Sequence, residues 1–80
     1  MDRKLVLDRT VRIFADVMDV DPATVSAETT ADDVESWDSI SHVRLIMSIE
    51  SAFGANFTNA EIGGFQRLGD IADTMAAKLS

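Results

Sequence analysis

A carboxylate, a hydroxyl and the only imidazole of this 80-residue chain lie within five residues of one another, at Asp38, Ser39 and His42. A hydrolase could use such groups as nucleophile and base. A serine and a histidine one turn apart on a single helix lack the oxyanion-binding donors that acyl transfer requires, and the sequence offers no other histidine. We therefore expect no catalytic residue and no enzyme activity, with His42 half-buried in a structural role.

Ser39 is better placed to hold an anion than to attack a substrate. Asp38 is a preferred N-cap residue, and the apolar residues after it recur at helical spacing, which predicts a helix from Ser39 to Phe53 that ends before Gly54. The first N–H groups of a helix lack intrahelical partners and face the positive end of its dipole. A phosphate ester on Ser39 would lie in this favourable field, although a plain helix cap fits the same pattern.

The predicted helix 39–53 carries two apolar faces rather than one. The face expected to pack in the core consists of Leu45, Ile46, Ile49 and Phe53. The second consists of Ile40, Val43 and Met47 and lies more than a quarter-turn away. One face suffices for a core, so we expect the second to contact partner proteins. In the alternative, Ile40 and Val43 pack under the preceding loop and only Met47 is exposed.

Apolar periodicity predicts two further long helices and one short helix. The first long helix covers residues 5–18, and the last covers residues 68 to about 78. The predicted buried face of the first is centred on Leu7, Val11, Phe14 and Met18 and is broadened by Val6, Ile13 and Val17. Thr58-x-x-Glu61 is a capping-box pattern that predicts a short helix ending at Gly63-Gly64.

The predicted connection between the first two long helices is long. Asp21-Pro22 predicts a single helical turn, and residues 26–37 have no helical period. We expect Val25, Val34 and Trp37 to attach this loop to the helices. The predicted fold is therefore an all-α, small four-helix bundle, with three long helices and one short helix, that forms a single domain over residues 1–80.

Charge and composition exclude several classes of partner. The net charge is −7, and residues 16–38 hold eight acidic residues without any Lys or Arg. This acidity predicts no nucleic-acid binding and favours protein partners with basic docking patches. Without Cys, and with Thr24 and Thr30 where an EF-hand needs Gly and Glu, we expect no metal site. No apolar run suggests membrane insertion or a signal peptide, so we expect a cytoplasmic protein.

Three segments together resemble the acyl carrier protein family. Asp38-Ser39-Ile40 is similar to the family's Asp-Ser-Leu triplet, residues 43–54 to its apolar helix that closes on Phe-Gly, and Leu68-Gly69-Asp70-Ile71 to the start of its fourth helix. The resemblance implies a monomeric acyl carrier whose Ser39 receives 4′-phosphopantetheine from coenzyme A through a phosphopantetheinyl transferase. The thiol of this arm would hold acyl, aminoacyl or polyketide intermediates as thioesters for the acyl-loading and acyl-processing enzymes of a fatty-acid, polyketide or specialised acyl pathway. The alternative is a helical protein–protein interaction module that is not a carrier.

The resemblance also implies roles for single residues. Asp38 would orient the attachment site and assist the transferase's metal; the docking residues would be Ile40, Val43 and Met47, with Arg44 and Glu50 selecting the partner. Arg44 stands where fatty-acid carriers commonly have an acid, which favours a specialised pathway over standard fatty-acid synthesis. Arg67 replaces a usual capping Thr, and we expect this to affect only the start of the last helix.

Overall fold

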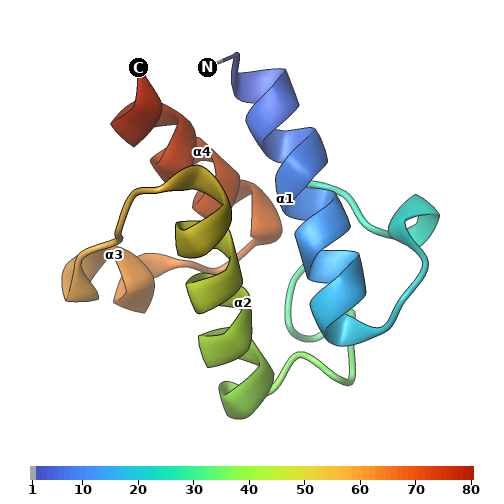
Figure 1. Cartoon of the computed structure of the whole chain (residues 1–80). Helices are drawn as coiled ribbons and strands as arrows, with labels where there is room; N and C mark the ends of the chain where they lie inside the picture. The colour runs from blue at the N-terminus through green and yellow to red at the C-terminus, as the bar shows by residue number, and fades with distance from the viewer. Residues whose placement is uncertain (1) are drawn as a thin grey trace.

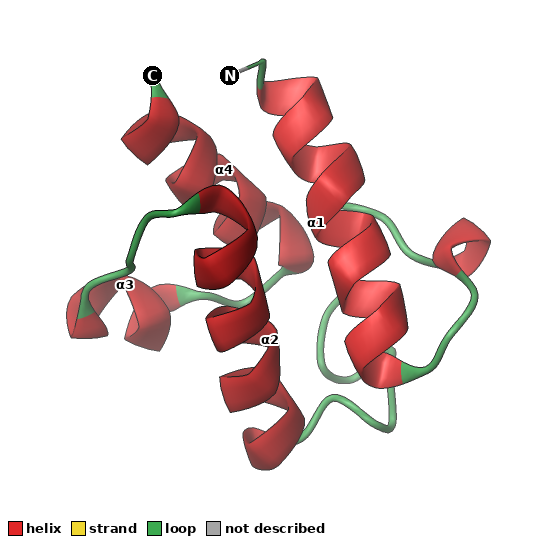
Figure 2. Ribbon diagram, in the orientation of Figure 1, coloured by secondary structure: helices red, strands yellow, loops and turns green. Residues whose placement is uncertain are grey.

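The computed structural model describes residues 2–80, and within them the only regular elements are helices. They are α1 (Arg3–Met18), the 3₁₀ turn η1 (Pro22–Thr24), α2 (Ser39–Phe53), α3 (Asn59–Gly64) and α4 (Leu68–Leu79), as Figures 1 and 2 show. The predicted bundle of three long helices and one short helix is confirmed. So are the bounds of the helix after Asp38 and the single turn after Asp21.

Helix α1 begins two residues earlier than predicted. Asp2 has an extended backbone, and its carboxylate accepts a hydrogen bond from the Lys4 N–H at 3.1 Å. This N-cap satisfies one of the unpaired N–H groups of the first turn, so the helix begins at Arg3 instead of Leu5. Leu5 consequently lies on the helix surface and is 54% exposed.

The buried face of α1 is centred differently from the prediction. Val6, Thr10 and Phe14 are fully buried, whereas Leu7 and Val11 are only half-buried. A polar residue at the centre of the face was not expected. The Thr10 hydroxyl donates to the Val6 carbonyl at 2.7 Å, and this bond within the helix removes the cost of burying an unpaired hydroxyl.

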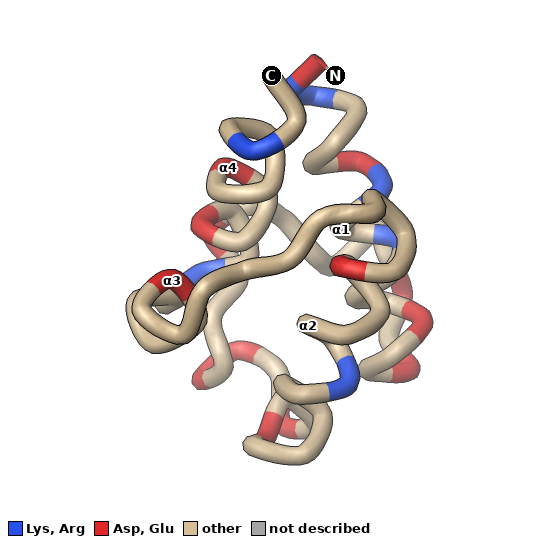
Figure 3. The backbone as a smooth tube through the Cα atoms, turned by 60° about the vertical axis from the view of Figure 1, so that its left-hand side comes forward, with Lys and Arg blue, Asp and Glu red and all other residues tan. Residues whose placement is uncertain are grey.

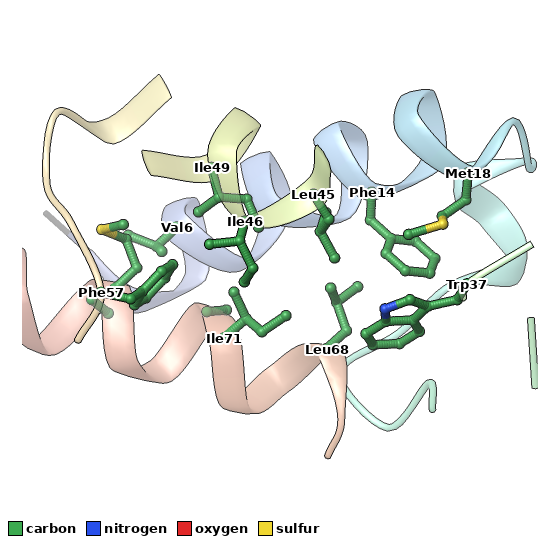
Figure 4. Close-up of a cluster of buried hydrophobic side chains, with 13 residues drawn as sticks. Val6, Phe14, Met18, Trp37, Leu45, Ile46, Ile49, Phe57, Leu68 and Ile71 are labelled. Carbon is green, nitrogen blue, oxygen red and sulfur yellow. The ribbon is translucent and has the colours of Figure 1, made fainter. Parts of the chain in front are cut away.

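The core lies where α1 packs against α2 and α4. Figure 4 shows Leu45, Ile46 and Ile49 of α2 facing Leu68 and Ile71 of α4, as the apolar periodicity predicts. Trp37, from the loop before α2, lies at one end of this cluster beside Phe14 and Met18. The loop therefore contributes to the core, as predicted for Trp37; Val34 packs at the edge of the same cluster.

Backbone hydrogen bonds attach the loop between α1 and α2 to the start of α4. The Leu68 N–H donates to the Thr29 carbonyl at 2.9 Å, and the Gly69 N–H donates to the Ala27 carbonyl at 2.8 Å. A Cβ atom at position 69 would lie 2.8 Å from the same Ala27 oxygen. Only glycine permits this approach, so the loop is held by α4 at a position where no side chain fits.

Arg67 strengthens the same attachment. Its Nη1 donates to both carboxylate oxygens of Glu28 at 2.9 and 2.8 Å, and its Nη2 donates to Asp70 at 3.2 Å. Thr30 and Arg67 also form an isolated antiparallel bridge. The expectation that Arg67 affects only the start of α4 is therefore wrong, because its side chain reaches the loop 39 residues earlier in the chain.

The short helix α3 is defined by its caps. Gly54 ends α2 in the left-handed conformation with φ 70°, and Thr58 and Glu61 form the predicted capping box. Glu61 also pairs with Lys78 in the last turn of α4 at 2.7 Å. This ion pair links α3 to the C-terminal end of the bundle.

The charges are unevenly distributed along the fold. Figure 3 shows Asp and Glu residues along the connection from α1 to α2, the segment in which residues 20–37 carry no Lys or Arg. Within residues 2–80, no helix has the length and apolar character needed to span a bilayer. The same residues contain no group of three or more His, Asp or Glu side chains that could hold a metal ion.

Candidate functional site

The site is built around the start of α2. Asp38 has an extended backbone, and its carboxylate accepts a hydrogen bond from the Ser41 N–H at 2.9 Å. This bond lowers the pKa of Asp38 because it stabilises the charged carboxylate. Asp38 is thus the N-cap, and Ser39 is the first helical residue, with an exposed side chain. The predicted helix start is confirmed.

A cavity of about 430 Å³ opens beside Ser39. Three segments of the chain form its walls: the loop before α2, the first turn of α2, and the connection between α3 and α4. Its lining residues are Ala31, Trp37, Asp38, Ser39, His42, Phe65 and Gln66. The Arg67–Glu28 hydrogen bonds join the first and third of these segments next to the cavity.

His42 lines this cavity and is engaged by Trp37. The Trp37 Nε1–H donates to His42 Nδ1 at 3.0 Å, and the two rings stack with their centroids 6.1 Å apart. Burial lowers the pKa of His42 below its ordinary value of 6.5, so the ring is neutral near pH 7 and carries its proton on Nε2. Nδ1 cannot take up a proton while it accepts the hydrogen bond from Trp37. This geometry supports a structural role for His42.

The second apolar face of α2 is exposed. Ile40 is 70%, Val43 57% and Met47 63% exposed. The alternative in which Ile40 and Val43 pack beneath the loop is therefore wrong. The loop is attached to α4 through Leu68 and Gly69, so it does not cover this face of α2.

The two charged residues assigned to partner selection differ in their surroundings. Arg44 is exposed on α2. Glu50 is half-buried, and its Oε2 accepts a hydrogen bond from the Phe57 N–H at 2.8 Å. The carboxylate of Glu50 thus helps to hold the connection between α2 and α3, a role that sequence spacing did not indicate because Phe57 lies outside any helix.

These residues fit a covalently attached phosphate ester. The Ser39 side chain is exposed, so a modifying enzyme can reach it, and it lies at a helix N-terminus, where an anion is favoured. A cavity lies on one side of it, and an exposed apolar face begins at the next residue. A small helical bundle with an exposed serine at the start of a helix is typical of carrier domains.

Comparisons with known proteins identify the family. Residues 8–75 match the family model described as the phosphopantetheine attachment site. The acyl carrier protein of Thermosynechococcus vestitus is 31% identical over 81 residues, which cover 100% of this chain and 99% of the relative. The chain belongs to the acyl carrier protein family. It is accordingly a carrier protein and not an enzyme, and its prosthetic group is covalently attached 4′-phosphopantetheine.

Solved structures share the fold. The holo acyl carrier protein of Geobacter metallireducens superimposes with a TM-score of 0.83 at 38% identity, covering 92% of this chain and 85% of that one. The acyl carrier protein of Enterococcus faecalis gives a TM-score of 0.76 at 23% identity, covering 96% and 98% of the two chains. The predicted bundle is thus confirmed by comparison as well as by its helices.

Proposed function

We propose that Ser39 is the residue that carries 4′-phosphopantetheine and that the loaded arm serves a specialised acyl pathway. The main support is the position of Ser39. Its exposed hydroxyl follows the Asp38 N-cap directly and lies within residues 8–75, which match the phosphopantetheine attachment site model. A transferase joins the serine oxygen to the phosphorus of the arm and displaces the nucleotide part of coenzyme A. The arm supplies the thiol that this chain, which has no Cys, lacks.

The chain's own residues prepare this attachment. Asp38 holds the first turn of α2 through Ser41, and its charged carboxylate lies next to the serine, where it can assist the transferase's metal. Ile40, Val43 and Met47 present an apolar surface beginning one residue after Ser39. We propose that this surface docks the transferase and the acyl-processing enzymes, with Arg44 and Glu50 selecting among them.

The acidic connection before α2 supports partners with basic docking patches. Residues 19–38 of this connection hold seven carboxylates, and this acidity argues against nucleic acid as a partner. The basic Arg44 on the exposed side of α2 favours a specialised pathway over standard fatty-acid synthesis. We propose that the protein works as a cytoplasmic monomer without inserting into a membrane.

Mass spectrometry of the intact protein tests the attachment site. The purified apo-protein is incubated with coenzyme A and a broad-specificity transferase. We expect a gain of one phosphopantetheine arm in the wild type and none in Ser39→Ala. Ser36→Ala is the matched control, because Ser36 lies three residues before Ser39, in the loop that precedes α2, and its hydroxyl already donates to the Met18 carbonyl.

An arm that remains on Ser39→Ala would place the attachment elsewhere and overturn the assignment. Absence of any arm on a folded wild-type protein would favour the alternative, a helical interaction module with Ser39 as a plain helix cap. Circular dichroism of each variant tests whether the helical bundle is intact.

A further inference from the structure

The cavity beside Ser39 ends on aromatic side chains that are already packed. Trp37 is only 8% exposed, although it lines the cavity, so most of its indole faces inward. Its ring meets Phe14 edge-on with centroids 4.9 Å apart, and Phe14 is fully buried. Figure 4 shows Trp37 at this end of the core, next to Phe14 and Leu68. Trp37 therefore separates the cavity from the interior of the bundle.

The other ring-bearing side chains of the lining are also anchored. His42 is held by the 3.0 Å hydrogen bond from Trp37, and Phe65 packs edge-on against Phe57 with centroids 5.1 Å apart. To pass between these rings, a group attached near Ser39 must displace the indole and break its hydrogen bond to His42. An indole N–H left without a partner inside the protein costs free energy.

The walls cannot separate freely to admit a larger group. Phe65 and Gln66 precede Arg67 directly, and Ala31 follows Thr30, so the Arg67–Glu28 pair and the Thr30–Arg67 bridge join the two sides of the cavity. The Gly69–Ala27 hydrogen bond adds a backbone tie at 2.8 Å. Moving the loop away from the start of α4 thus requires the loss of these contacts together.

We propose that Trp37 and His42 are specificity-determining residues that close the cavity and restrict the cargo to short acyl groups, which remain outside the helical core. This inference rests on the proposed attachment of the arm at Ser39. A short acyl group has little apolar surface to bury, so a closed core costs it little free energy. A long alkyl chain would gain free energy by burying its methylene groups in the core, but Trp37 prevents its entry.

The test compares acyl chain lengths on the same protein. Ser39 is loaded with acetyl-, butyryl- and octanoyl-phosphopantetheine, and loading is verified by intact mass. The rate of thioester cleavage by hydroxylamine then reports shielding of the cargo. For the wild type we expect cleavage rates that do not fall with chain length, and an emission spectrum of Trp37, the single tryptophan, that does not change between butyryl and octanoyl loading.

Variants of the closing pair should admit the longer chain. In Trp37→Ala we expect octanoyl cleavage to slow by about tenfold relative to butyryl, because burial of two methylene groups already shifts an equilibrium by about this factor. Trp37→Phe removes the hydrogen bond but keeps a ring, and His42→Ala removes the acceptor; both should slow octanoyl cleavage in the same direction. If Trp37→Ala fails to fold, the octanoyl cleavage rates of Trp37→Phe and His42→Ala decide whether the inference holds.

Met18→Ala is the matched control. Met18 is buried near Trp37 in the core but does not line the Ser39 cavity. Its replacement by alanine should therefore lower the stability of the bundle without opening a path from the cavity into the core. Octanoyl shielding in the wild type, or equal shielding in Met18→Ala and the Trp37 variants, would overturn the inference while leaving the arm on Ser39. Absence of the arm from Ser39 would instead be a failure of the proposed function.

Discussion

At the scale of single residues, the hydrogen bond between Trp37 and His42 joins the loop to α2 beside Ser39. It requires a neutral imidazole, because a protonated ring carries hydrogen on both nitrogens and Nδ1 can no longer accept. Burial holds the pKa of His42 below 6.5, which favours this neutral form in the folded protein. The contact is therefore sensitive to acid.

We predict that stability falls as the pH is lowered through 6.5. In this range the unfolded chain takes up a proton on His42 before the folded chain does, so acidification favours unfolding until the lower folded pKa is passed. Urea denaturation at about pH 7.5, 6.5 and 5.5, followed by Trp37 emission, measures the effect. The stability difference across this range should be smaller in His42→Gln.

Three carboxylates with lowered pKa values act in a more acidic range than His42 does. Hydrogen bonds lower the pKa values of Asp38, Glu61 and Asp70 below 3.8, 4.5 and 3.8, so their contributions are lost only in stronger acid. An identical pH dependence in the wild type and His42→Gln would contradict a role for His42.

At the scale of elements, the attachment of the loop to α4 positions the site. It keeps residues 26–37 away from the exposed face of α2 and places Trp37 in the core. The closest approach is at Gly69, where a Cβ atom would meet the Ala27 carbonyl oxygen at 2.8 Å and the Ala27 Cβ at 3.0 Å. Both contacts are shorter than ordinary van der Waals separation, so the loop or α4 must move to accept a side chain.

We predict that Gly69→Ala destabilises the protein by roughly 1–3 kcal/mol, the usual range for overpacking. Gly63→Ala is the matched control, because no atom lies within 4 Å of its added Cβ. Since alanine has the better helix propensity, Gly63→Ala should be neutral or stabilising by up to about 1 kcal/mol. Urea denaturation compares the two, and equal stability of both variants would show that the loop is not held closely at Gly69.

At the scale of the whole molecule, the protein carries exposed apolar side chains on two different helices. Met47 lies on α2, on the face that begins beside Ser39, and is 63% exposed. Leu5 lies on α1 and is 54% exposed. Their similar exposure allows a docking surface to be distinguished from a general effect of surface hydrophobicity.

We predict that Met47→Ala lowers kcat/KM for arm attachment by about tenfold, the factor expected when most of a methionine side chain is no longer buried on docking. Leu5→Ala should leave kcat/KM unchanged. Both reactions are followed by intact mass against time. Because the net charge is −7, the wild-type rate should also fall as salt is added. Equal effects of the two substitutions would remove the case for docking on α2.

Much of the fold and of the site was determined locally, and so was predictable from the sequence. The N-cap at Asp38, the capping box at Thr58 and Glu61, and the C-cap at Gly54 depend on residues within a few positions of one another. The periodicity of α2 likewise separated a buried face from one that is exposed, because helical geometry relates nearby positions whatever the rest of the chain does. The start of the site helix and the family resemblance both follow from such patterns.

Only the tertiary structure decided how the loop between α1 and α2 is attached to the start of α4. The Arg67–Glu28 pair joins residues 39 positions apart, and the Gly69–Ala27 contact joins the same two segments. No local pattern specifies which of several acids an arginine will meet. Thr10 shows the same limit within α1, because a threonine fits the buried face only when its hydroxyl bonds to the preceding turn, and only the packed bundle determined which face that is.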